Sequence, residues 1–283
     1  MTSDIKIKHL SEFLKETRLK LLSRGLVPEL ALKRFPDLSK LTNGLPKGNI
    51  ILIGARPSNG KSVMALNIAY DLAIQGKNIL FLSLEMTIPR LLERLFCLEC
   101  SLHNYDLKEG LFANSQKVQE KFEMFSQMIK KSNFIASDMI GKNWIEIDHF
   151  LKNLDQKPDA VFIDHIQEIT GPDRKKSMDE YLNNMRIMCI RDNFALVLCS
   201  QINRLSQNEE AKTPQLHHLK GTGFLEESAD IAILLHWPYH YDRSKNKNYF
   251  EINIAKNRDG EPGYIKLRFE PHFYRLQPWE DSS

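Results

Sequence analysis

Residues 51–70 constrain the fold of this chain more than any other segment. They read ILIGARPSNGKSVMALNIAY: an apolar run, a loop, the triplet Gly-Lys-Ser and a stretch with helical spacing. A loop that leads from a buried strand into a helix presents backbone N–H groups and the positive end of the helix dipole, which bind phosphate. In such a loop the lysine reaches the β- and γ-phosphates, and the next hydroxyl binds Mg²⁺. We therefore predict an ATP-binding loop formed by Ala55, Arg56, Pro57, Ser58, Asn59, Gly60, Lys61 and Ser62.

This loop departs from the strict pattern G-x-x-x-x-G-K-[ST] at its first position. Counting back from Gly60 gives Ala55, because Gly54 lies one residue too early. The alternative interpretation is a chance Gly-Lys-Ser turn without a ligand. The order of strand, loop, Gly-Lys-Ser and helix favours phosphate binding.

The rest of the chain has the texture of an α/β protein. The runs NIILIGA, NILFLSLE, DAVFID, FALVLCSQ and DIAILLHW alternate with helical stretches and are apolar on both faces. Such strands are typical of a mainly parallel twisted sheet that helices cover on both sides. The later runs NYFEINIAKN and YIKLRFE alternate apolar and polar residues, so we expect an antiparallel hairpin at the edge of the sheet.

Three of the buried runs end in polar residues, namely Glu85, Asp164 and Gln201. Ligands of open α/β sheets bind outside the carboxyl ends of the strands. We therefore predict that Asp164 serves the metal ion, that Glu85 acts as the general base on water, and that Gln201 contacts the γ-phosphate or that water. Each residue alone is also consistent with a helix cap or a loop entry, and the hypothesis depends on their occurring together.

Lys256 and Arg258 lie at the end of FEINIAKN, on the same face of the expected strand. Two like charges in this position favour an anion between them. The γ-phosphate bound to a neighbouring subunit is one such anion, which would make the pair catalytic residues acting in trans. Solvated residues of an edge strand are the alternative.

Composition limits the class of protein. Of the residues, 42% are hydrophobic and 27% are charged, with 39 Lys and Arg against 36 Asp and Glu for a net charge of +3. Membrane-spanning, collagen-like and disordered classes are therefore excluded. The start MTSDIKIKHL lacks the apolar core of a secretory signal, and four cysteines form no disulfide framework, so we expect a cytoplasmic protein.

Two further segments stand out. Residues 8–24 place apolar side chains at helical spacing in a narrow stripe, which includes Leu10, Phe13, Leu14 and Leu21. Residues 202–222 form a long polar stretch of the kind that is usually functional. The Cys97-Leu-Glu-Cys100 motif has no second pair at zinc-site spacing, so we expect buried helix cysteines there.

As a set, these motifs resemble the C-terminal, RecA-like motor domain of the DnaB family of hexameric replicative helicases. The resemblance covers residues 35–276 and rests on FPDLSKLTNGLPKGNIILIGARPSNGKS, FLSLEM, VFIDHIQEI, LCSQINR, LKGTGFLEESADIAILL and AKNRDGEPGYIKLRFEP, in the family's order. The loop ARPSNGKS and the hairpin AKNRDG-x-x-G are the most distinctive. Alanine at the first position of the phosphate loop also occurs in this family.

The resemblance implies a role for each matching residue. Gly60, Lys61 and Ser62 would hold ATP and Mg²⁺, and the strand-end residues would have the roles already given. Lys256 and Arg258 match the pair that enters the neighbouring subunit's site. The loop before FLEESAD resembles the DNA-contacting loop, with Lys220, Gly221 and Gly223 at the positions that hold the strand's phosphates. Gly221 stands where the family usually has an acid.

The N-terminal part differs more. DnaB-type proteins usually carry a helical collar domain that meets primase, and here only residues 1–34 precede the expected motor domain, 35–283. Residues 8–24 resemble the linker helix that docks on the adjacent subunit.

We therefore predict an ATP-driven hexameric helicase that moves on single-stranded DNA and unwinds duplex in replication, with a loader or primase as a further partner. The family implies 5′ to 3′ movement. One alternative is a RecA-like DNA-dependent ATPase that serves recombination or annealing without unwinding. The other is a regulator that binds a full-length helicase.

Overall fold

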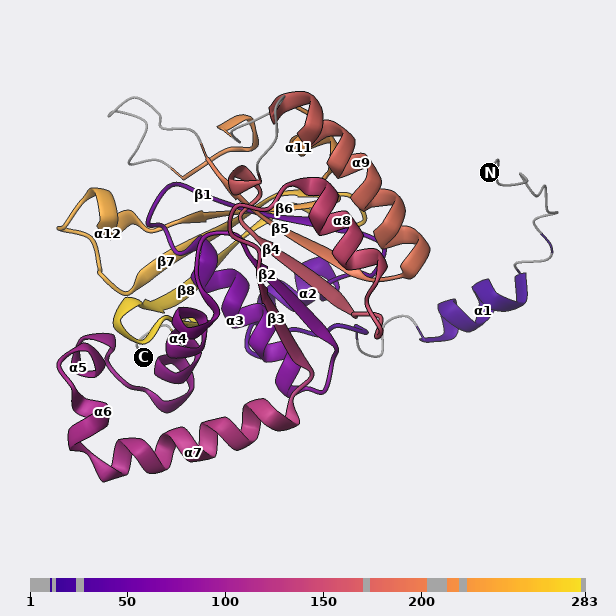
Figure 1. Cartoon of the computed structure of the whole chain (residues 1–283). Helices are drawn as coiled ribbons and strands as arrows, with labels where there is room; N and C mark the ends of the chain where they lie inside the picture. Colours follow the sequence, from indigo (N-terminus) through magenta and orange to yellow (C-terminus); the bar gives the residue numbers. More distant parts are fainter. Residues whose placement is uncertain are drawn as a thin grey trace.

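The protein is described from a computed structural model, which covers residues 11, 14–23, 28–169, 174–202, 213–218 and 223–280. The described strands form one nine-stranded sheet in the order β3-β2-β4-β5-β1-β6-β7-β8-β9 (Figure 1). The neighbouring strands β3, β2, β4, β5, β1 and β6 are parallel to one another. Strands β7, β8 and β9 extend the sheet with antiparallel pairing. The strands are β1 (Ile50–Ala55), β2 (Ile79–Ser83), β3 (Phe134–Asp138), β4 (Ala160–Asp164), β5 (Ala195–Gln201), β6 (Ile231–His236), β7 (Tyr249–Asn257), β8 (Gly263–Glu270) and β9 (Arg275–Pro278).

Helices cover both faces of this sheet (Figure 1). The described α-helices are α1 (Leu14–Ser23), α2 (Pro36–Thr42), α3 (Lys61–Ile74), α4 (Ile88–Cys100), α5 (Asn104–Lys108), α6 (Leu111–Asn114), α7 (Gln116–Lys131), α8 (Trp144–Lys152), α9 (Arg174–Asp192), α11 (Gly223–Ser228) and α12 (Pro238–Tyr241). Three short 3₁₀ helices are also described, η2 (Ile166–Glu168), η3 (Leu216–His218) and η4 (Pro271–Phe273).

The two faces of the sheet carry separate hydrophobic cores because side chains alternate along each strand. On β1, Ile51 and Ile53 pack into the core that contains α3 and α4, whereas Ile50 and Leu52 pack into the core that contains α8 and α9. Both cores bury their strand residues almost completely. The predicted runs that are apolar on both faces are therefore confirmed as strands between two helical layers.

The segment before β1 is part of this packing. Leu30, Leu32 and Phe35 are buried in the core that contains α3, and the N–H of Leu45 donates to the carbonyl of Leu30 at 3.0 Å. Helix α1 instead lies apart from the sheet (Figure 1), and the side chains of Leu14, Leu19 and Leu22 are exposed. The predicted division at residues 34 and 35 stays a prediction.

The predicted α/β class is confirmed, with one correction at the end of the chain. The hairpin of β7 and β8 is antiparallel as expected, but it is not the edge of the sheet, because β8 pairs with β9. The register Phe269↔Leu276 places β9 beside the last residues of β8. Strand β9 is only four residues long, so alternation of apolar and polar residues hardly reveals it.

Candidate active site

The carboxyl ends of four parallel strands meet at one edge of the sheet. Strand register pairs Ala55 at the end of β1 with Gln201 at the end of β5. It also pairs Ser83 at the end of β2 with Asp164 at the end of β4. The predicted loop and strand-end residues are therefore neighbours, as the rule for open α/β sheets requires.

The predicted phosphate loop joins β1 to α3, and hydrogen bonds of its own residue Asn59 hold it in place. The buried Asn59 amide donates to the carbonyl of Pro57 at 3.0 Å and to the hydroxyl of Tyr241 at 2.8 Å, and its oxygen accepts from the N–H of Trp237 at 3.0 Å. Asn59 thus fixes the loop to the segment after β6. It is a scaffold of the binding loop.

Gly60 turns this loop into the first residue of α3. Its φ of 76° lies in the left-handed region that favours glycine. A Cβ there would also stand 3.3 Å from the ring of Phe250, which closes the floor of the loop. Helix α3 begins at Lys61, so its N-terminal N–H groups are available to phosphate oxygens.

Asp164 supplies a buried negative charge beside this loop. Its side chain is 0% exposed, and its Oδ1 lies 4.0 Å from the Nζ of Lys61. Within the described residues neither carboxylate oxygen accepts a hydrogen bond. A buried carboxylate with unused oxygens is costly, and it suits a divalent cation.

The donor set therefore fits the expected Mg²⁺. Ser62 lies in the first turn of α3 and Asp164 at the end of β4. In the described part of the chain, no group of three or more His, Cys, Asp or Glu side chains forms a metal cage. Mg²⁺ takes few protein ligands and completes its shell with phosphate oxygens and water, so one hydroxyl and one carboxylate suit it.

Glu85 stands just past β2, and its side chain is 56% exposed. The loop beneath it is fixed because Ser83 Oγ donates to the carbonyl of Met86 at 2.6 Å and Leu84 N donates to the carbonyl of Asp164 at 2.7 Å. The carboxylate of Glu85 is thus held at the cavity and open to water. This geometry suits a general base.

His165 is a functional candidate that sequence reasoning missed. Its Nδ1 lies 3.2 Å from Glu85 Oε2, and its Nε2 lies 3.3 Å from Glu168 Oε1. Burial, with a contribution from Lys61, lowers the pKa of His165 below that of an ordinary histidine. Its position directly after Asp164 is the signal that would have drawn attention to it.

Gln201 closes β5 at the cavity. Its N–H donates to Oε1 of Gln167 at 3.0 Å, and Gln167 Nε2 donates to Ser200 Oγ at 2.8 Å. Gln167 thereby fixes the backbone that presents Gln201.

These residues surround a cavity of about 510 Å³, a size typical of a small-ligand site. Of the predicted residues, the cavity is lined by Ala55, Arg56, Pro57, Ser58, Gly60, Lys61, Ser62, Glu85 and Gln201. Asp164 and Asn59 are buried and do not line the cavity, but Asp164 lies 4.0 Å from the lining residue Lys61.

The other part of the cavity wall is aromatic and basic, and sequence reasoning missed it. It includes Arg90, Arg94, Trp237, Phe269, Pro271 and Tyr274. The guanidinium of Arg94 stands 5.0 Å from the ring centre of Tyr274, and burial lowers the pKa of Arg94. Trp237 follows β6 directly, so the rule of strand ends that identified Gln201 would also have found it.

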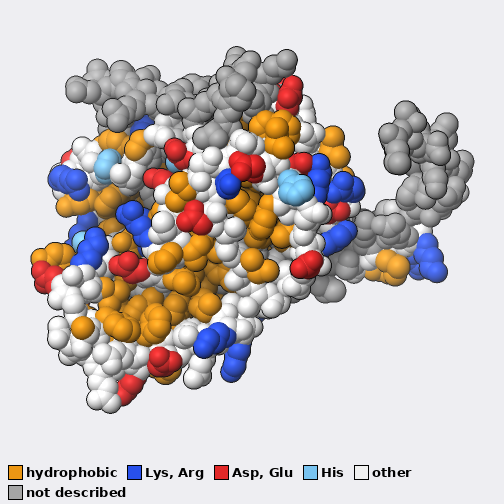
Figure 2. All heavy atoms as spheres, in the orientation of Figure 1, with side chains coloured by type: hydrophobic (Ala, Val, Ile, Leu, Met, Phe, Trp, Pro, Cys, Tyr) orange, Lys and Arg blue, Asp and Glu red, His pale blue; other side chains and the backbone are white. Residues whose placement is uncertain are grey.

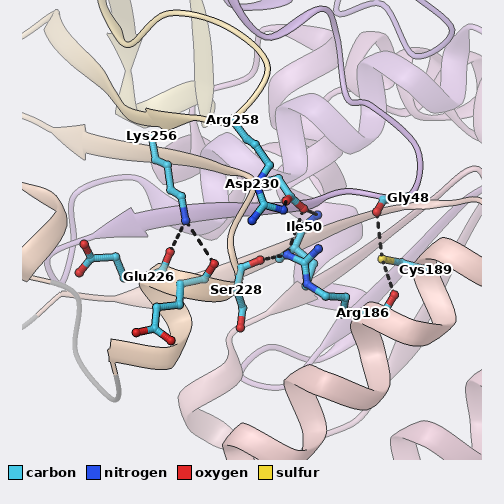
Figure 3. Close-up of polar contacts among 10 residues, drawn as sticks. Gly48, Ile50, Arg186, Cys189, Glu226, Ser228, Asp230, Lys256 and Arg258 are labelled. Atoms are coloured by element: carbon cyan, nitrogen blue, oxygen red, sulfur yellow. Dashed lines mark hydrogen bonds and ion pairs between the residues drawn. The ribbon is translucent and has the colours of Figure 1, made fainter.

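Lys256 and Arg258 lie away from the cavity, at the end of the sheet where the parallel strands begin. They stand at the end of β7, where Lys256 pairs with Ala232 at the start of β6. Neither residue lines the cavity. Lys256 Nζ donates to the carbonyls of Glu226 and Glu227 in α11, and Arg258 Nη1 donates to Asp230 Oδ1 (Figure 3).

The predicted DNA-contacting residues are only partly described. Lys220 and Gly221 lie outside the described residues, and Gly223 is the first residue of α11. Of the long polar stretch 202–222, the structure describes residue 202 and residues 213–218. The predicted helix cysteines lie in α4, with Cys97 buried and Cys100 half-buried.

Comparison with known proteins decides the family. A model of the DnaB-like helicase C terminal domain matches residues 32–278. The chain belongs to this family. The resemblance stated from the sequence is therefore confirmed.

Relatives and solved structures of this family agree with the fold. The chain is similar to the replicative DNA helicase DnaC of Bacillus subtilis, with 29% identity over 86% of this chain and 55% of the relative. A solved ATPase domain superposes with a TM-score of 0.88 at 25% identity, covering 97% of this chain and 100% of that one. A DnaB-like replicative helicase studied with primase gives 0.84 at 26%, covering 97% and 68%. The chain spans about half the length of the curated relatives it matches.

In the part of the chain that the structure describes, no helix has both the length and the apolar character needed to cross a bilayer.

Proposed function

We propose that this chain is the motor of an ATP-driven hexameric helicase, which moves 5′ to 3′ on single-stranded DNA and unwinds duplex during replication. One observation carries the proposal. The phosphate loop, Glu85, Asp164 and Gln201 meet around one cavity, while Lys256 and Arg258 stand at the end of the same sheet where the parallel strands begin.

Within the cavity, the chain's own residues divide the work of hydrolysis. The loop from Ala55 to Ser62 holds the phosphates through its N–H groups, and Lys61 neutralises charge on the β- and γ-phosphates. Glu85 accepts the proton of the attacking water, and Gln201 orients that water or the γ-phosphate. Ser62 and Asp164 would hold Mg²⁺, which when bound neutralises charge on the phosphate oxygens.

The position of Lys256 and Arg258 supports an active site shared between subunits. The phosphate loop follows the end of β1. Lys256 and Arg258 instead lie level with the beginning of β1, because the end of β7 pairs with the start of β6, and Ile231 at that start pairs with Ile51. The pair therefore stands a strand's length from the cavity of its own chain and serves a neighbour's cavity. A head-to-tail contact gives a ring when its rotation closes and a filament when it does not, and we propose that it closes here into a hexamer.

We further propose that α1 docks on the neighbouring subunit. Leu14, Leu19 and Leu22 expose about two thirds of their surface. Exposed hydrophobic side chains also gather over the region between α4 and α7 (Figure 2), on elements that carry Leu92, Phe112, Phe122, Met124, Met128 and Ile135. An apolar helix face and an apolar surface that are both exposed within one chain suit each other across a subunit contact.

For DNA contact, we propose the segment that leads into α11. Gly223 begins this helix, and Lys220 and Gly221 precede it in sequence. Backbone N–H groups of glycines bind phosphates without reading the bases, which suits movement along any sequence. A loader or primase is a further proposed partner, since one structurally similar helicase was studied with primase.

The experiment that tests this function is ATP-dependent strand displacement from a forked duplex, with 5′ and 3′ tails tried separately. We expect displacement with a 5′ tail only, and none by the Lys61→Ala variant. DNA-stimulated ATP turnover without displacement would instead favour the recombination or annealing ATPase. Absence of both turnover and displacement would favour the regulator.

A further inference from the structure

Asp230 is a buried carboxylate at the junction of three strands and one helix. Its side chain is 3% exposed, and it directly precedes β6. Its Oδ2 accepts from the N–H of Ile50 at 2.9 Å and lies 3.2 Å from Nη2 of Arg186 in α9. Its own N–H donates to the carbonyl of Ile50 at 2.8 Å. The carboxylate is therefore locked to the beginning of β1.

The second oxygen of this carboxylate is committed to Arg258. Oδ1 accepts from Arg258 Nη1 at 2.7 Å, and the Arg258 N–H donates to the carbonyl of Asp230 at 2.9 Å. The backbone and the guanidinium of Arg258 are thus both fixed to one residue (Figure 3). The Arg258 side chain is nevertheless 57% exposed, so it remains reachable from outside the subunit.

Because Asp230 is buried, its hydrogen bond holds the Arg258 guanidinium in one orientation. A carboxylate removed from water needs charged or N–H partners, and a charge-assisted hydrogen bond in such a place is short and strong. An exposed arginine without that anchor would sample many rotamers. Because Asp230 is itself held by Ile50 and Arg186, its oxygen presents a fixed point to Arg258.

We infer that Asp230 is a positioning residue for the trans-acting Arg258, which it aims at the γ-phosphate in the neighbouring subunit's site. This inference rests on the shared active site proposed above. Asp230 acts through Arg258 and is not among the residues that line the cavity of its own chain. The test must therefore separate positioning from a contribution to folding alone.

The experiment compares Asp230→Asn with Arg258→Ala, the double variant and a matched control, in assembled rings. The control is Asp159→Asn, since Asp159 also pairs with a cation, Lys47 at 2.7 Å, and accepts from a backbone N–H, that of Asn78 at 2.8 Å. ATP turnover, affinity for a fluorescent ATP analogue and the melting temperature are measured for each variant.

We expect Asp230→Asn to lower turnover about 10- to 100-fold, as misplacement of a catalytic group does, with unchanged affinity for the analogue. Added to Arg258→Ala, it should lower turnover no further. Mixed with Lys61→Ala subunits it should regain turnover, because its own cavity is intact. Mixed with Arg258→Ala it should not, because both defects lie on the same side of the interface.

The outcomes separate this inference from the proposed function. If Arg258→Ala itself leaves turnover unchanged, the shared active site is wrong. If Arg258→Ala lowers turnover but Asp230→Asn matches the control, Asp230 does not position Arg258. The same holds if Asp230→Asn lowers turnover by the same factor in the wild-type and Arg258→Ala backgrounds. Should Asp230→Asn fail to fold, Asp230→Glu keeps the charge and shifts it by one methylene. That variant should also lose turnover and be rescued by Lys61→Ala subunits, and absence of either effect would overturn the inference.

Discussion

Lys61 can interact both with bound phosphate and with the buried carboxylate of Asp164. It begins α3 at the phosphate loop, and its ammonium stands 4.0 Å from a carboxylate that accepts no hydrogen bond within the described residues. Without a nucleotide, Lys61 and Asp164 compensate each other's charge in a buried place. ATP and its metal ion would separate these roles, because phosphate oxygens attract Lys61 and the cation attracts Asp164.

Replacing Lys61 with alanine should therefore weaken ATP binding and lower turnover by at least about 100-fold, as loss of a charge-stabilising donor does. Binding of a fluorescent ATP analogue and steady-state hydrolysis measure the two effects. Lys142→Ala removes an exposed lysine paired with Glu146 and serves as the control. Unchanged turnover in Lys61→Ala would refute the phosphate-loop assignment.

Replacing Glu85 with glutamine should separate binding from chemistry. The amide has nearly the same shape but accepts no proton, so we expect normal affinity for ATP and turnover lowered about 100- to 10,000-fold. Glu120→Gln, an exposed substitution on α7, is the matched control. Normal hydrolysis by Glu85→Gln would assign the base to another residue, and Glu168 beside His165 is the next to test.

At the scale of elements, the strands that are completely buried were predicted best from the sequence. Strands β1, β2, β4, β5 and β6 were predictable because both their faces pack against helices. Strand β3 has only half-buried and exposed positions and reads FIASD, so it lacks this pattern. The aromatic side of the cavity comes from β8 and the segments after β6 and β8, which lie more than 170 residues from the phosphate loop. Only the folded sheet brings Phe269 and Tyr274 to Gly60.

The cysteines of these packed elements give a prediction about reactivity. Burial raises the pKa of the Cys97 thiol in α4 to about 12 and that of Cys189 in α9 to about 11, whereas an ordinary thiol has a pKa near 8.5. A raised pKa keeps the thiol protonated and unreactive at neutral pH. Alkylation of these two residues at pH 8, followed by mass spectrometry, should therefore be at least about 100-fold slower in the folded protein than in the unfolded chain. Equal rates in the two states would contradict the raised pKa values.

At the scale of the whole molecule, one sheet has two unlike ends. The cavity lies where the parallel strands end, and Lys256 and Arg258 lie where these strands begin, beside the end of α11. The pKa of Lys256 is lowered, first by burial and then by the charge of Arg258, which agrees with two cations placed side by side. Under the proposed function, a single chain would carry both halves of an active site and would join them only with another copy.

Mixing two inactive variants tests this arrangement. Rings assembled from equal amounts of Arg258→Ala and Lys61→Ala should regain turnover at about a quarter of their interfaces, where an intact cavity faces an intact arginine. Steady-state hydrolysis across mixing ratios measures the rescue. Lys61→Ala mixed with Glu85→Gln is the control, because both defects lie in the cavity. Absence of rescue at every ratio would count against an arginine acting in trans.

The tie between Asn67 and the last strand has a consequence for synthesis on the ribosome. The Asn67 amide in α3 donates to the carbonyl of Tyr274 at 2.8 Å and accepts from the N–H of Leu276 at 3.1 Å, contacts that join residues more than 200 positions apart. The aromatic wall that faces the phosphate loop is translated more than 170 residues after that loop. A nascent chain therefore carries an open, incomplete cavity until Tyr274 has left the exit tunnel.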